Sequence, residues 1–276
     1  MRKARLVTFG AILAVAVGAA IAVAQQPVPT VAVSASPTAV EVQAPAALAA
    51  GPTRLDITRQ GNKDVSLYFA LLNQGVSLQE LQTAIARDGR NGESALGLVW
   101  IQASASLTAS EPRRAVTFNL RPGLTYVVLA EEDTDSGTPQ RSVTTFATSG
   151  QANGATAPAP AATVRMQGLR FRGSAVLPRQ GVVRMENRDG VPHFAIAFPL
   201  RKSATTKRLG RALRSNNERA LGRLVAGQPY RLQNLISGGN TANDQEVRFP
   251  RTGRYALMCF FHAHHTLGMY RVVTVR

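Results

Sequence analysis

The chain has 276 residues, which is enough for one large domain or two of ordinary size. Hydrophobic residues make up 45% and charged residues 17%, a composition that excludes a wholly disordered protein. It carries 32 Lys and Arg against 16 Asp and Glu, a formal charge of +16. A single cysteine excludes an internal disulfide and every zinc or iron–sulfur site built from several cysteines.

The first 24 residues have the pattern of a secretory signal peptide. Three cations at positions 2, 3 and 5 precede an apolar stretch of small residues, and Ala22-Val23-Ala24 fits the pattern of a cleavage site. We therefore predict a signal peptide over residues 1–24 and a secreted, periplasmic or otherwise extracytoplasmic protein. The alternative is a retained membrane anchor, because the apolar stretch is nearly long enough to span a bilayer.

Two stretches rich in Ala, Pro, Ser and Thr divide the rest of the chain. Residues 25–52 have a single charged residue, Glu41, and predict a flexible linker. Residues 149–160 predict a second linker of the same kind. Two pieces of single-domain size remain, residues 53–148 and residues 161–276.

Short strand-like runs recur in both pieces, punctuated by Gly, Pro, Asn and Asp as in a β-sandwich. They cover residues 65–72, 115–120 and 125–129 in the first piece, and 181–185, 193–198, 246–249, 255–259 and 269–275 in the second. Each piece also has one stretch with helical periodicity, at residues 78–86 and 206–214. We predict an all-β fold of two sandwich domains, each with a short helical insert.

The two pieces also share motifs in the same order. The run Tyr68–Leu71 parallels His193–Ile196, and the run Tyr126–Ala130 parallels Tyr255–Cys259. This order predicts a duplicated domain.

Every histidine and the only cysteine lie in the second piece. They are His193, Cys259, His262, His264 and His265, and Met269 follows shortly after them. Imidazole, thiolate and thioether form a soft donor set suited to copper, with zinc as an alternative on chemistry alone. Two imidazoles and a thiolate, with a weak axial thioether, are the arrangement of a one-electron copper site.

Two motifs in this piece resemble the cupredoxins, the blue (type 1) copper family that includes plastocyanin, amicyanin and auracyanin-like proteins. The first is the run Asn187–His193, with an Asn a few residues before Pro-His at the start of a strand. The second is the run Gly253–Cys259 followed by His264 and Met269, in the C-x4-H-x4-M spacing that the family uses. The resemblance covers approximately residues 163–276.

The resemblance implies one copper ion held by His193, Cys259 and His264, with Met269 as the long axial ligand. His262 is the alternative second imidazole, but it leaves a long interval to the methionine, so we predict His264. The implied function is to carry single electrons in exchange with a redox partner protein that the sequence does not identify. We expect no enzyme, because the chain has no GxSxG, HExxH or phosphate-binding glycine motif.

The implied fold is a pair of cupredoxin-like Greek-key β-sandwiches. Residues 161–276 form the copper-binding domain, and residues 53–148 form a degenerate copy without metal ligands. Within the second copy, three positions depart from the family: Phe194 replaces an Asn that ties the ligand loops, Phe260 replaces a small hydroxyl residue, and Arg271 replaces a Gly. Losing those hydrogen bonds predicts a looser site with a different potential.

These departures motivate a second hypothesis, a metal-free or degenerate cupredoxin-fold module that binds a partner through its charge. A third is copper storage or delivery, with His262 and His265 as spare ligands.

The excess charge belongs to the second piece. Residues 160–276 contain 20 basic and 5 acidic residues, a net charge of +15. Eight of these cations lie within residues 201–223: Arg201, Lys202, Lys207, Arg208, Arg211, Arg214, Arg219 and Arg223. The first six are predicted to contact an acidic protein, an anionic surface or an extracellular polymer. We expect no nucleic acid, because an exported protein without interleaved aromatic residues has no base-reading module.

Overall fold

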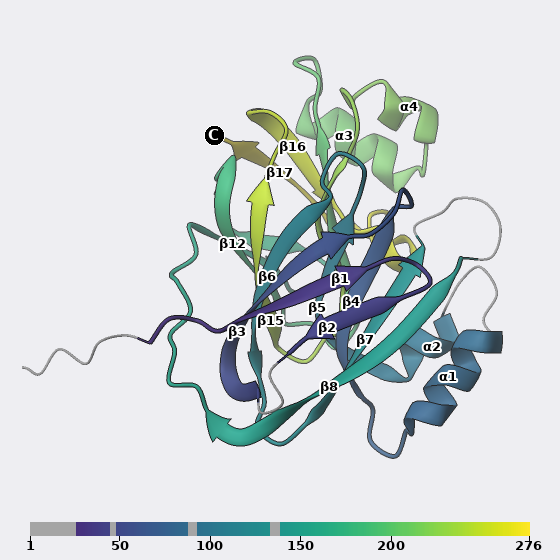
Figure 1. Ribbon diagram of the computed structural model, residues 1–276. Helices are drawn as coiled ribbons and strands as arrows, with labels where there is room; N and C mark the ends of the chain where they lie inside the picture. The colour runs from purple at the N-terminus through teal and green to yellow at the C-terminus, as the bar shows by residue number, and fades with distance from the viewer. Residues whose placement is uncertain (1–25, 45–47, 88–92, 133–138) are drawn as a thin grey trace, which may run out of the picture.

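The computed structural model describes residues 26–44, 48–87, 93–132 and 139–276. Two β-sandwiches follow one another along the chain, and the two helical inserts lie at separate ends of the strand body (Figure 1). The predicted signal peptide, residues 1–24, lies outside the described residues. Within the described ranges, no helix is both long enough and apolar enough to cross a membrane.

The first sandwich packs its sheets around a core that includes Val33, Leu55, Phe69 and Tyr126. Its strands are β1 (Thr30–Ala35), β2 (Val40–Gln43), β3 (Leu48–Arg59), β4 (Val65–Leu72), β5 (Val99–Leu107), β6 (Arg113–Leu120), β7 (Thr125–Glu132) and β8 (Arg141–Ala152). Helices α1 (Leu78–Arg87) and α2 (Glu93–Gly97) lie between β4 and β5.

The flexible linker predicted for residues 25–52 is wrong over most of its length. Strands β1 and β2 pair there as an antiparallel hairpin, β1 also pairs with β3, and β3 already begins at Leu48. Val31, Val33 and Ala35 alternate along β1 and are buried, so the small apolar residues form the inner face of a strand. The linker predicted for residues 149–160 likewise begins too early, because β8 continues to Ala152.

The second sandwich consists of two sheets around a core that includes Met185, Leu232 and Tyr255. One side contains β9 (Ala162–Met166), β10 (Phe171–Gly173), β12 (Gln180–Asn187) and β15 (Thr241–Arg248). The other contains β11 (Val176–Leu177), β13 (His193–Pro199), β14 (Tyr230–Ile236), β16 (Gly253–Met258) and β17 (Tyr270–Val275). Helices α3 (Thr206–Arg214) and α4 (Glu218–Gly222) lie between β13 and β14, and the 3-10 turn η1 (Phe261–Ala263) follows β16.

Both sandwiches repeat the same strand pairings. The parallel pair β1–β3 corresponds to β9–β12, and the antiparallel pair β3–β6 corresponds to β12–β15. Strand β4 pairs with β5 and β7 as β13 pairs with β14 and β16. Pairing of β12 with β15 across the β13–β14 hairpin is a Greek-key connection. The predicted all-β class, with two cupredoxin-like sandwiches that each carry a helical insert, is confirmed.

The two sandwiches are joined through their strands. Strand β15 pairs with β6 at Asp244↔Thr117 and Gln245↔Val116, which makes one 12-stranded sheet. A buried layer of amides and hydroxyls also crosses the boundary, where Gln233 Nε2 donates to Ser104 Oγ at 2.7 Å. The joint therefore positions the first sandwich firmly against β14 and β15 of the second.

Candidate metal centre

His193 is the first residue of β13 and is fully buried. The loop before it is held by Asn187, whose Nδ2 donates to the carbonyl oxygens of Val191 at 2.9 Å and Ile236 at 3.2 Å. The Oδ1 of the same side chain accepts from the backbone N–H of Asp189 at 3.1 Å. The Asn of the first motif therefore shapes the loop that delivers the imidazole.

Cys259 follows directly after β16, and the chain then turns sharply back. His262 and Ala263 have positive φ values of 42° and 58°, which reverse the chain within η1. The loop closes through two backbone bonds, from Met269 N to His264 O at 3.0 Å and from Cys259 N to Met269 O at 3.3 Å. This compact loop brings His264 back beside the cysteine.

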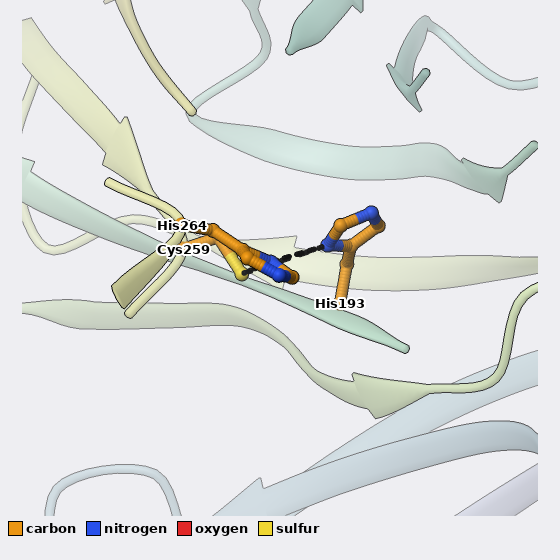
Figure 2. A group of neighbouring side chains, drawn as sticks. All are labelled: His193, Cys259 and His264. Atoms are coloured by element: carbon orange, nitrogen blue, oxygen red, sulfur yellow. Dashed lines mark hydrogen bonds between the residues drawn. The ribbon is translucent and has the colours of Figure 1, made fainter. Parts of the chain in front are cut away.

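Three donor atoms face one another at this point, His193 from one strand and Cys259 and His264 from the loop opposite (Figure 2). The two Nδ1 atoms are 3.1 Å apart. Cys259 Sγ lies 3.8 Å from His193 Nδ1 and 3.7 Å from His264 Nδ1. Across the part of the chain that the structure describes, this is the one such group of three or more His, Cys, Asp or Glu side chains.

The separations fit a transition ion. An ion bound at about 2.0–2.1 Å from nitrogen and about 2.3 Å from sulfur, with bond angles of about 100–120°, sets nitrogens about 3.1–3.6 Å apart and nitrogen and sulfur about 3.3–3.8 Å apart. The three separations of 3.1, 3.7 and 3.8 Å fall in these ranges. Two imidazoles with one thiolate are the donor set that copper prefers. The residues present therefore fit copper.

The protonation states suit a metal site. Burial lowers the pKa of His193, against the effect of Asp189, and burial also lowers the pKa of His264. Both imidazoles are therefore neutral near pH 7, which leaves a nitrogen lone pair available. Burial raises the pKa of the Cys259 thiol to about 11, although the backbone N–H groups of Phe194 and Phe261 act to lower it. Metal binding must consequently release a proton from this thiol.

Asp189 orients the His193 ring. Its Oδ2 accepts from His193 Nε2 at 2.8 Å, which assigns the ring proton to Nε2 and leaves Nδ1 free for a metal. Although burial opposes ionisation, hydrogen bonds from the Gly168 N–H, from His193 and from the Leu169 N–H hold the pKa of Asp189 below its usual value. A carboxylate is thus fixed one imidazole ring away from the donor atoms.

The β9–β10 turn links the two ligand loops. On one side Asp189 accepts from the turn's backbone at Gly168 N, 2.6 Å, and Leu169 N, 3.2 Å. On the other side Arg170 Nη1 donates to the carbonyl oxygen of Leu267 at 2.8 Å. Leu267 lies in the ligand loop between His264 and Met269. The sequence offered no Asn at position 194 to tie the loops, and the structure makes the tie through this turn instead.

The remaining predicted residues fall in different places. Met269 is fully buried in the core beside the group, and its role as axial ligand stays a prediction. His262 is exposed and stands outside the three-residue group. His265 is buried and its Nε2 lies 3.1 Å from Asn216 Oδ1, at the end of α3.

The two phenylalanines that depart from the family pattern have packing roles. Phe194 lies in an apolar cluster with Tyr68 and Leu129 of the first sandwich. Phe260 packs in the cluster beneath α3 and α4, with its ring 4.6 Å from that of His265. Sequence reasoning missed these contacts and that of Arg170, because they join segments far apart in the chain. It also missed Asp189, although this residue lies only four positions before His193 in the first motif.

No protein-family model matches the chain, and no curated protein matches it either. Among solved structures, auracyanin B is 25% identical over 44% of this chain and 93% of its own, with a TM-score of 0.27. Auracyanin A, a "blue" copper protein of Chloroflexus aurantiacus, is 21% identical over 41% and 96%, with a TM-score of 0.26. A copper nitrite reductase of Nitrosomonas europaea is 11% identical over 91% and 94%, with a TM-score of 0.24.

These likenesses are to copper proteins, but their TM-scores are low, so the assignment of the site depends on its own geometry. The structure brings together the two motifs that carry the resemblance to the cupredoxins, because His193 of the first motif faces Cys259 and His264 of the second. The Greek-key pairing that the resemblance implies is also present.

Proposed function

We propose that this protein binds one copper ion at His193, Cys259 and His264 and carries single electrons outside the cytoplasm. The observation that carries the proposal is the buried group of two imidazole nitrogens and one sulfur at copper-binding separations. Bound copper supplies a one-electron couple. The chain's own side chains supply the donor atoms and hold them in position.

The side chains that would hold the ion are themselves fixed by hydrogen bonds. His193 is fixed by Asp189, the loop of His264 is closed by its own backbone, and Arg170 fastens that loop to the β9–β10 turn. A rigid donor set changes little between two oxidation states, which favours rapid electron exchange. Met269, buried next to this loop, is the residue proposed as the axial thioether.

Burial favours an electron carrier over an enzyme that binds a substrate at the ion. His193 and Cys259 are 0% exposed and His264 is 8% exposed. A substrate cannot reach donor atoms enclosed in this way, whereas an electron can cross the intervening side chains. We therefore propose electron carriage without substrate turnover.

The alternative of a metal-free binding module is less well supported. A decayed site loses donors or turns them to other partners, yet all three donors here are buried and face one another. Phe194, one reason for proposing decay, packs against the first sandwich and leaves its backbone N–H directed at the cysteine sulfur.

Titration of the purified apoprotein with Cu(II) tests the proposal. An intense blue thiolate-to-copper absorption band should appear at one equivalent. It should be lost in Cys259→Ser and retained in His262→Ala, a matched control because His262 is exposed and outside the group. A colourless titration, or a band that survives Cys259→Ser, would refute the proposal.

A further inference from the structure

We infer that the helical hairpin of α3 and α4 is the docking surface for an acidic redox protein that exchanges electrons with the copper centre. This inference rests on the proposed function and adds the location and the chemistry of the partner. Three observations carry it: the charge of the hairpin, the lack of carboxylate partners for that charge, and the place where the hairpin contacts the ligand loop.

The hairpin and its leading turn are densely cationic. Eight basic side chains are exposed on them: Arg201, Lys202, Lys207, Arg208, Arg211, Arg214, Arg219 and Arg223. The one acidic residue in the same segment is Glu218. For the described residues, the ion pairs formed with Asp and Glu include none of these eight cations. The charge is therefore available to an external partner.

Packing determines which way the cations point. The apolar side of α3 consists of Leu209, Ala212 and Leu213, which are buried against Ala256 and Met258 of β16. The basic residues at the intervening helical positions must then face solvent. Arg211 and Arg214 lie in the last turn of α3 and Arg219 in that of α4, where they also favour the helix dipole, but the other five cations gain nothing comparable.

The hairpin rests on residues that directly follow three of the predicted ligands. Phe260, after the cysteine, packs in the cluster beneath it. His265, after the second histidine, bonds Asn216 between the two helices. Tyr270, after the methionine, has its hydroxyl so close to Gly210 that a Cβ there would collide with it. The hairpin and the residues next to the ligands are thus what separates a partner seated on its exposed face from the metal centre.

The surface chemistry favours a protein over a membrane. In the described part of the chain, the exposed large apolar residues are Leu124, Val176, Val191 and Leu267, and none lies on α3 or α4. A membrane-surface helix normally inserts apolar side chains beside its cations. An acidic protein requires only complementary charge. In the exchange one electron passes between the partner's redox centre and copper, Cu(II) becoming Cu(I) when the partner is oxidised, and no atom or proton is transferred.

Electron exchange with a small anion, hexacyanoferrate(II), tests the surface by stopped-flow measurement on the copper-loaded full chain. We would compare wild type with the triple variant Lys207→Glu, Arg211→Glu and Arg214→Glu. The matched control reverses three exposed arginines away from the hairpin: Arg113→Glu, Arg179→Glu and Arg276→Glu. At low salt the hairpin variant should react about 10-fold or more slowly than wild type, and the control less than about 3-fold more slowly. High salt should remove both differences.

The outcomes separate the two proposals. Equal slowing of the two variants, with all proteins showing the same blue band and reduction potential, would refute the docking surface and leave the copper proposal intact. Absence of the band in wild type would refute the copper proposal itself. Vesicles of phosphatidylserine and phosphatidylcholine that sediment wild type, but not the hairpin variant, at physiological salt would refute the protein partner in favour of an anionic membrane.

Discussion

The carboxylate of Asp189 should lower the reduction potential of the copper centre, and Asp189→Asn should raise it. Asp189 Oδ2 lies 2.8 Å from His193 Nε2, on the side of the ring opposite the donor nitrogen. A nearby negative charge stabilises Cu(II) more than Cu(I), because the oxidised ion carries the larger positive charge. Asparagine has nearly the same shape and still offers an oxygen to Nε2.

The size of the shift follows from Coulomb's law. The ring and the metal bond add about 4 Å to the hydrogen bond, so the carboxylate lies about 7 Å from the ion. One unit charge at about 7 Å with an effective dielectric constant of about 20 interacts with about 2 kcal/mol. For a one-electron couple, in which a tenfold change in equilibrium corresponds to about 59 mV, this is about 90 mV. The Asp189 side chain is only 14% exposed, so solvent screening stays moderate.

A spectroscopic redox titration at fixed ionic strength measures the shift. Glu41→Gln is the matched control, because it removes one exposed carboxylate from β2 of the other sandwich and should change the potential by less than about 20 mV. A shift no larger than that of the control would show that this carboxylate does not act on the copper centre.

Three further substitutions test the packing around the site. Gly268→Ala should lower the free energy of unfolding by about 1–3 kcal/mol and speed copper loss to a chelator, because Gly268 has φ +98° and a Cβ there would collide with Arg170. Unchanged values would show that the bond from Arg170 to Leu267 does not hold the ligand loop. Asn216→Gly should lower stability by about 1 kcal/mol through loss of the His265 bond, unlike Asn240→Gly, which also replaces an Asn at positive φ. Glu111→Gln should raise the melting temperature at pH 7 but not near pH 4. Burial raises the pKa of Glu111, so the stabilising neutral carboxyl is lost as the pH rises through that pKa, whereas glutamine stays neutral. Equal changes in melting temperature at both pH values would refute this reasoning.

Local spacing made the second half of the site predictable. Cys259, His264 and Met269 lie on one short loop, so their order alone indicates a shared site. His193 is distant in sequence, but it opens a strand, and the family resemblance supplied its role. The order of strands and helical inserts could be predicted because the same order of strand-like and helical stretches occurs in both halves of the sequence.

The linker and the register of the repeat could not be predicted. A stretch of Ala and Val with few charges is equally typical of a tether and of a buried strand, and only pairing of β1 with β3 decides between them. When Tyr126 is matched with Tyr255, Leu129 takes the position of Met258. Tyr68 pairs with Leu129, and Ile196 pairs with Met258. Tyr68 therefore corresponds to Ile196 and not to His193. The parallel drawn between Tyr68 and His193 is therefore displaced by three residues.

The pairing of the two sandwiches gives the first one a structural role toward the second. A fragment containing residues 161–276 alone would expose Phe194, Leu235 and Phe261 to water, together with amides that now bond to Ser104 and its neighbours. Such a fragment would be prone to aggregation, and the loops that carry the donors would lose one of their supports. Residues 161–276 are therefore not a separable unit, because the first sandwich covers part of their apolar surface and pairs with their buried amides.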